Sequence, residues 1–180
     1  MILHTASHLI QYGSSSYDSG SRIVTDSFGN AYVTAQTHIG IDGHTNARSN
    51  DIFIIKFTNA GIKQWTRQLG PSSNEYGYGI ATDPSGNVYV TGYTGGNLDG
   101  NNNAQGNDVF VVKYDVTGAK QWTKLLGTSS GDIAYDIAAD SNSNVCVTGP
   151  ILGGLGGTTN AGSVDTVSYT HLTLPTSDLV

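Results

Sequence analysis

Short apolar and aromatic runs, separated by clusters of Gly, Asn, Asp and Ser, form the dominant pattern along this chain. The runs at residues 79–83, 88–94, 109–114 and 120–126 are mostly rich in β-branched and aromatic side chains, which is typical of strands. No stretch keeps the 3.6-residue apolar period of an amphipathic helix, so we expect few helices. The pattern therefore predicts an all-β chain of short strands and tight turns.

The strand pattern recurs at a fixed step of 57 residues. This step links several sets of identical residues, among them Asp26, Asp83 and Asp140, then Gly13, Gly70 and Gly127, then Asp51, Asp108 and Asp165. Aligned without a gap, residues 14–70 and 71–127 agree at about 27 of 57 positions, which is far above chance. We conclude that a unit of four strands has been duplicated in tandem.

The period and the strand count predict an incomplete β-propeller made of four-stranded antiparallel blades. A single blade cannot bury both of its apolar faces, whereas stacked blades cover one another. We expect blade one at 14–70, blade two at 71–127 and part of blade three at 128–166, with 1–13 supplying the last strand of an upstream blade. Seven such blades would need about 400 residues, so we expect a fragment whose sheet faces are open at both ends.

Two strings carry a family resemblance: GIATDPSGNVYVTGYT in the second unit and SRIVTDSFGNAYVTAQT in the first. They resemble the bacterial SBBP-type β-propeller repeat. The string NDVFVVKYDVTGAKQWTKLLG extends the match, which covers about residues 7–165. The resemblance implies a propeller fold in an exported or surface protein of bacteria. It implies no particular biochemical activity.

The C-terminal residues 167–180 depart from the repeat. Where the first two units have DIFIIKF and DVFVVKY, the third has DTVSYTH. Residues 167–180 resemble translated sequencing-adaptor read-through, and we assign them no function. The alternative is a divergent final strand, in which Val167, Tyr169 and Leu172 belong to the sheet.

Composition and charge exclude several function classes. The chain has 8 Lys and Arg against 14 Asp and Glu, a net charge of −6, and no basic stripe, so we expect no nucleic-acid binding. No apolar run reaches the ~18 residues of a membrane span, and the first 13 residues lack the pattern of a signal peptide. Charged residues make up only 12% of the chain, which favours an extracellular or cell-surface bacterial protein.

The turn after the first strand of each unit is built on Asp and Asn. Residues 83–87, DPSGN, have the signature of a type I turn in which Gly is free to take a positive φ. The third unit lacks this Gly, and we expect Asn to take the left-handed conformation there. Since these residues recur in every unit, we interpret them as turn-forming rather than catalytic. They are Asp26, Gly29, Asn30, Asp83, Gly86, Asn87, Asp140 and Asn144.

The long loops between the second and third strands, at 38–50 and 95–107, are the candidate binding face, because long loops often carry function. In an up-and-down blade both loops lie on the same edge of the ring. The residues that could bind a ligand there are His38, Asp42, His44, Asp99, Asn101 and Asn103.

One of these loops has some features of a calcium site. Asp99, Asn101 and Asn103 offer oxygen ligands at alternate positions, as calcium loops do. However, Ala104 and Phe110 stand where an EF-hand loop needs Gly and a bidentate Glu. Calcium is therefore the one cofactor that we consider.

The other loop offers a set of transition-metal ligands, His38, Asp42 and His44. The 57-residue step places no histidine at the equivalent positions, so the two histidines belong to the first unit alone. The alternative is that they are solvated polar residues of a surface loop.

The sequence contains no motif of a catalytic site. It has no Gly-x-Ser-x-Gly, no phosphate-binding Gly-Lys-Ser/Thr and no His-Glu-x-x-His. Trp65 and Trp122 recur on fourth strands, which indicates blade packing, and Cys146 replaces a strand Tyr as a small buried residue. We predict a non-enzymatic scaffold for protein or glycan binding. The alternatives are a propeller enzyme with catalytic residues outside this chain and a structural spacer.

Overall fold

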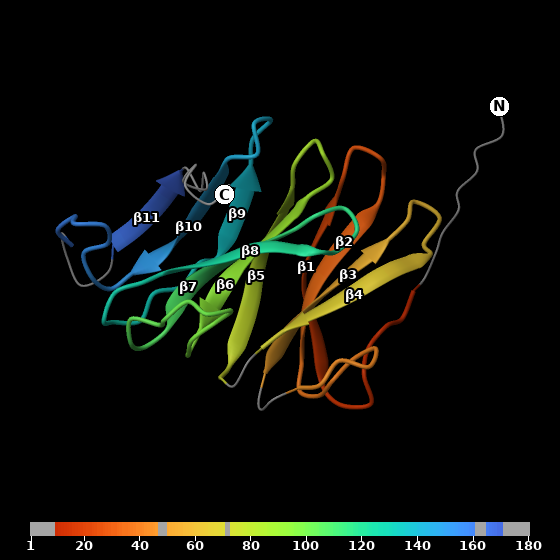
Figure 1. Ribbon diagram of the computed structural model, residues 1–180, viewed down its shortest axis with the longest axis horizontal. Helices are drawn as coiled ribbons and strands as arrows, with labels where there is room; N and C mark the ends of the chain where they lie inside the picture. The colour runs from red at the N-terminus through yellow and green to blue at the C-terminus, as the bar shows by residue number, and fades with distance from the viewer. Residues whose placement is uncertain (1–9, 47–49, 71–72, 161–164, 171–180) are drawn as a thin grey trace.

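The computed structural model describes residues 10–46, 50–70, 73–160 and the strand at 165–170. These residues form three antiparallel sheets that lie side by side in chain order (Figure 1). The first sheet contains β1 (Asp18–Thr25), β2 (Ala31–Thr37), β3 (Asp51–Phe57) and β4 (Lys63–Leu69). The second contains β5 (Glu75–Thr82), β6 (Val88–Thr94), β7 (Asp108–Tyr114) and β8 (Lys120–Leu126). The third contains β9 (Asp136–Ala139), β10 (Val145–Ile151) and β11 (Asp165–Thr170).

The strand order confirms the predicted fold of four-stranded antiparallel blades. Strands run β1-β2-β3-β4 and β5-β6-β7-β8, so each blade is a simple meander. The backbones of neighbouring sheets approach each other at the first strand of the later sheet: β5 lies against β1, β2 and β3, and β9 lies against β5 and β6. The sheets therefore converge at their first strands and diverge outward, as an open arc of a β-propeller does. Within the described ranges, no helix has the length and hydrophobicity to cross a membrane.

Two of the three buried apolar clusters of the described residues lie in the seams between neighbouring sheets, and the third lies on sheet one alone. The first seam packs Tyr32, Ile52 and Ile54 of sheet one against residues such as Val90 and Phe110 of sheet two. All seven residues of β3 are buried, which explains why DIFIIKF is almost continuously apolar. Burial of one such Ile, Val or Phe side chain contributes roughly 1.5–3 kcal/mol. The seams are thus the main source of stability, and each needs the walls of two blades.

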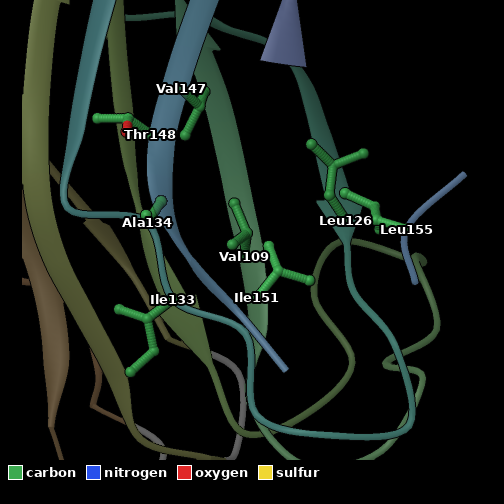
Figure 2. A pocket seen from close by; sticks show the side chains of 9 residues that line it. Val109, Leu126, Ile133, Ala134, Val147, Thr148, Ile151 and Leu155 are labelled. Carbon is green, nitrogen blue, oxygen red and sulfur yellow. The ribbon is translucent and has the colours of Figure 1, made fainter. Parts of the chain in front are cut away.

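Each long loop buries an apolar side chain: Leu98 lies in the first seam and Leu155 packs against the second, whereas Ile41 packs with Phe53 and Ile55 in a separate cluster on sheet one. Ile41, Leu98 and Leu155 are spaced by the 57-residue step; Ile41 and Leu98 are buried, and Leu155 packs against the second seam. The second seam, between sheets two and three, contains a small pocket, and Figure 2 shows Leu155 on the same side of this pocket as Leu126. The pocket that remains measures about 20 Å³, which is close to the size of one water molecule. We name these three side chains the wedge residues.

The Asp turns repeat in detail. Asp26 Oδ1 accepts hydrogen bonds from the backbone N–H groups of Phe28 and Asn30, and Asn30 Nδ2 donates to Asp26 Oδ2 at 2.8 Å. Asp83 and Asp140 make the same three bonds within their own turns. These bonds lower the pKa of Asp26, although burial works in the opposite direction.

Two expectations about the third unit were wrong. Ser143, and not an Asn, takes the left-handed conformation, with a φ of 65°. Ser143 stands at the position of Gly86, and its hydroxyl donates to Asp83 Oδ2 in the neighbouring blade at 2.8 Å. This bond across the seam offsets the backbone strain. Cys146 is only partly buried rather than a buried small residue.

At the N- and C-terminal ends of the described chain, the structure differs from the sequence-based expectation. Residues 10–13, expected in the last strand of an upstream blade, are not in a strand, and residues 1–9 lie outside the described residues. The Tyr12 ring packs edge-on against Phe57 of sheet one, 6.4 Å between centroids. At the other end, β11 pairs with β10 from Asp165 to Thr170, so 167–170 continue the third sheet. Residues 171–180 lie outside the described residues, and the read-through interpretation stays a prediction.

Candidate functional site

The first long loop holds Asp42 inside a network of hydrogen bonds. Asp42 takes a φ of 52°, and its Oδ2 accepts bonds from Lys63 Nζ at 2.6 Å, from Thr66 Oγ1 at 2.5 Å and from the hydroxyl of Tyr12. Burial opposes ionisation, but the bonds from Lys63 and Thr66 outweigh it and lower the pKa of Asp42 to about 2. Asp42 therefore fastens its loop to β4.

Asp99 performs the same task in the second unit. It takes a φ of 49°, and its carboxylate accepts bonds from Lys120 Nζ and Thr123 Oγ1, both at 2.5 Å. The 57-residue step relates each of these three residues to its counterpart in the first unit. That recurrence was the signal that sequence reasoning missed. We call each set of Asp, Lys and Thr a loop clamp.

The neighbouring asparagines also hold the second loop in place. Asn101 Nδ2 donates to the carbonyl oxygens of Leu98 and Thr123, at 3.1 and 3.2 Å. Asn103 Nδ2 donates to the Thr94 carbonyl, and its Oδ1 accepts the N–H of Gln105. A calcium ion bound by Asp99 would have to replace Lys120 and Thr123, so calcium binding here stays a prediction.

The structure does not bring His38 and His44 together around Asp42. The His38 ring lies 5.2 Å from the Tyr17 ring, whereas His44 Nε2 lies 3.3 Å from the Thr66 carbonyl oxygen. Across the described part of the chain, no three His, Cys, Asp or Glu side chains gather closely enough to hold a metal ion. The long loops therefore wedge and clamp the blades, and their role as a binding face stays a prediction.

A different group of side chains gathers where the first strands converge. Tyr76 on β5 stacks on Tyr93 of β6, with ring centroids 4.9 Å apart and planes 23° apart. Tyr78 lies 5.9 Å from Tyr93 and 5.8 Å from Tyr135, which comes just before β9. Tyr135 is 52% exposed and the other three are partly exposed. We call these four residues the tyrosine patch.

The tyrosine patch joins all three blades. Asn50, which precedes β3, donates from Nδ2 to the Tyr76 hydroxyl at 2.6 Å. The N–H of Tyr135 donates to the Thr148 carbonyl of β10 at 2.8 Å, which fixes the third-blade end of the patch. Burial, with the neighbouring tyrosines, raises the pKa of Tyr93 above its usual range. The patch thus presents neutral rings with hydroxyl groups, a chemistry suited to binding.

The tyrosine patch is not repeated in every unit. At the positions of Tyr76 the other units have Ser19 and Ile133, and at those of Tyr93 they have Gln36 and Pro150. Sequence reasoning missed the patch because it began the strand at residue 79, whereas β5 begins at Glu75. The available signal was the alternation of Tyr and Gly in EYGYG, which points two rings to one face.

The comparisons with known proteins agree with this architecture. The family model described as SBBP, a β-propeller repeat, matches residues 10–42, 64–99 and 121–156. Regulatory protein FlaEY of Caulobacter vibrioides is 31% identical over 140 residues, which is 70% of this chain and 15% of that protein. The uncharacterized WD repeat-containing protein L264 of Acanthamoeba polyphaga mimivirus is 27% identical over 127 residues, 61% of this chain and 9% of that protein. The chain therefore spans a small part of the length of either relative.

Proposed function

Because the chain belongs to the SBBP family of β-propeller repeat proteins, we propose that it is a non-enzymatic binding module whose tyrosine patch contacts a protein partner. The single observation that carries this proposal is the gathering of Tyr76, Tyr78, Tyr93 and Tyr135 at the convergence of the blades. A residue present in every unit serves the unit, whereas a specific binding surface needs residues that differ between units. Tyr76 and Tyr93 meet that condition, and Tyr78 recurs as Tyr135 but is Ser21 in the first unit, whereas the Asp, Lys and Thr of the loop clamp recur unchanged in the first two units.

Tyrosine chemistry supports a protein partner. Tyr is enriched at protein interfaces because it offers a large rigid surface and a polar tip at a small cost in side-chain entropy. The two relatives are named a regulatory protein and a WD repeat-containing protein, and neither name is that of an enzyme. The low charge content, 12% of residues, supports a secreted or cell-surface bacterial setting as part of the same proposal.

Selection from a displayed peptide library on the immobilised 180-residue chain tests the proposal, with a glycan array in parallel. We expect selected peptides to lose about tenfold or more in affinity when Tyr78 and Tyr135 are both changed to alanine. Tyr17→Ala is the matched control, because Tyr17 is 61% exposed and lies outside the patch. Peptides whose affinity survives the double substitution would refute the patch as the contact surface. Binding to glycans alone would refute a protein partner, and no binding at all would favour a structural spacer.

A further inference from the structure

Two carboxylates face the first seam from opposite blades. Asp51 is the first residue of β3 and Glu75 is the first residue of β5; their exposed fractions are 1% and 0%. The N–H of Glu75 donates to the carbonyl of Asn50 at 2.9 Å, which brings the start of β5 next to the residue that precedes Asp51. Asp51 acts electrostatically on Glu75. The seam therefore contains two buried acids that repel each other when both are ionised.

Each carboxylate has one oxygen with a partner and one without. Asp51 Oδ2 accepts a bond from Gln68 Nε2 at 2.7 Å, and Glu75 Oε1 accepts one from Thr94 Oγ1 at 2.8 Å. Asp51 Oδ1 and Glu75 Oε2 are buried and have no hydrogen-bond partner within the described part of the chain. A buried ionised oxygen without a partner is costly, so an added proton would lower the free energy of the seam.

Asp18 and Asp132 are the counterparts of Glu75 in the other two units. Each accepts a local backbone hydrogen bond that Glu75 lacks. Asp18 Oδ2 accepts the backbone N–H of Ser14, four residues earlier, and Asp132 Oδ2 accepts that of Thr128, both at 2.5 Å. Four residues before Glu75 the sequence has Pro71, which carries no backbone N–H. Glu75 is also the single glutamate of the chain. The second unit has thus lost the backbone donor that bonds to the carboxylate at this position in the other units.

Among the residues that the structure describes, no basic side chain forms an ion pair with Asp51 or Glu75. Among the described residues, the ion pairs are those of Lys63 with Asp42 and of Lys120 with Asp99. The two cations on strands packed against β5 donate elsewhere: Arg22 Nε to the Tyr78 carbonyl and Lys56 Nζ to the Val116 carbonyl.

Among the described residues, the other charged groups that share a sheet register with the two acids are acidic, and their direct register partners are neutral. Thr37 and Thr94 are the register partners of Asp51 and Glu75 on β2 and β6. Beyond these two threonines in sheet register lie Asp18 on β1 and Asp108 on β7, and β9 begins with Asp136. The surroundings therefore favour the neutral form of at least one of the two seam acids.

We propose that Glu75 keeps a proton at neutral pH and that this proton, taken from solvent, holds the first two blades together across Asp51. Burial raises the pKa of Glu75 to about 7, and the Asp51 charge adds to this; burial also raises the pKa of Asp51 to about 6. When the pH rises through 7, the proton leaves and the seam carries two charges. The seam then loosens in alkaline solution and tightens in mildly acidic solution.

A carbon-13 NMR titration of the intact chain, labelled at the glutamate side-chain carboxyl carbon, tests the first half of the proposal. Since Glu75 is the single glutamate, the chain gives one such resonance. We expect its midpoint near pH 7, and a move to an ordinary value near 4.5 in denaturant. A folded-state midpoint near 4.5 would overturn the proposal. A midpoint near 7 that falls when calcium is added at constant ionic strength would also overturn it, because a metal ion would then occupy the seam.

Amide hydrogen exchange of β5, corrected for intrinsic pH dependence, tests the second half. We expect protection in the wild type to fall between pH 6 and pH 8.5. Glu75→Gln, which imitates the protonated side chain, should show no such fall. If Glu75→Gln does not fold, the wild-type chain still decides the question, since protection that is constant over this range would refute the loosening. A Glu75→Gln variant that keeps the full pH dependence would refute the role of Glu75.

Discussion

Gly70 lies directly against Asp51: a Cβ atom at residue 70 would stand 2.2 Å from Asp51 Oδ1. Gly127 has the same relationship to Asp108, with a distance of 2.1 Å. The blade-to-blade link therefore needs glycine because a buried carboxylate occupies the space of a side chain.

Gly70→Ala should destabilise the chain by about 2–3 kcal/mol, since the new methyl group must displace the Asp51 carboxylate from a packed site. Urea unfolding followed by tryptophan fluorescence measures the change. Gly20→Ala is the control, because a Cβ atom there meets no atom within 4 Å. Equal unfolding midpoints for the two variants would contradict the steric explanation.

Leu98→Ala removes a wedge residue from the first seam and should cost about 3 kcal/mol. Leu98 is 1% exposed and packs with residues of both sheets, so the vacated space lies between the two blades. Leu152→Ala, at a leucine that is 44% exposed, should have little effect on the thermal midpoint. Equal thermal midpoints for the two variants would show that Leu98 does not stabilise the first seam.

Ser143 combines a strained backbone with a useful hydroxyl, and two substitutions separate these effects. Ser143→Gly relieves the positive φ of 65° but removes the bond to Asp83, so the two effects should nearly cancel. Ser143→Ala loses the bond and keeps the strain, so it should be less stable than Ser143→Gly by about 1 kcal/mol. Chemical denaturation of both variants gives this difference directly, and the reverse order would show that the strain is negligible.

The loop clamp of Asp42 should make the chain sensitive to acid. The folded-state pKa of Asp42, about 2, lies below its ordinary value of 3.8. The clamp therefore contributes its full stability above pH 4 and loses it as the pH falls through 2. Asp42→Asn should cost about 1 kcal/mol at pH 7, since the clamp is partly exposed. Unfolding free energies at pH 7 and pH 3 should show the gap between wild type and variant narrowing in acid, and a constant gap would rule out ionisation as its source.

Local chemistry made the turns and the blade count predictable. The Asp and Asn of each turn bond within five residues, so their role follows from spacing alone. The strands β6 and β7 are buried almost throughout, and such apolar runs are visible in any window of seven residues.

Contacts between residues that are distant in the chain could not be predicted from local sequence patterns. Asp42 and Lys63 are 21 residues apart, and only the folded loop shows that the carboxylate fastens the strand instead of binding a ligand. The tyrosine patch draws residues from two units, and half of it lies in the part of β5 that precedes the predicted strand. The repeat itself held part of the answer, because Asp42, Lys63 and Thr66 all recur at 57 residues.

Two of the three family matches start in the outer strand of a blade, at Gln64 in β4 and Gln121 in β8, and all three end in a long loop, at Asp42, Asp99 and Gly156. Each of these two matches therefore contains the outer strand of one blade and the first two strands and long loop of the next blade, instead of a single blade. If an array of this kind gains or loses a copy by unequal recombination, the new junction is assembled from halves that already fit. Propeller genes built in this frame can change in copy number without first evolving a new interface.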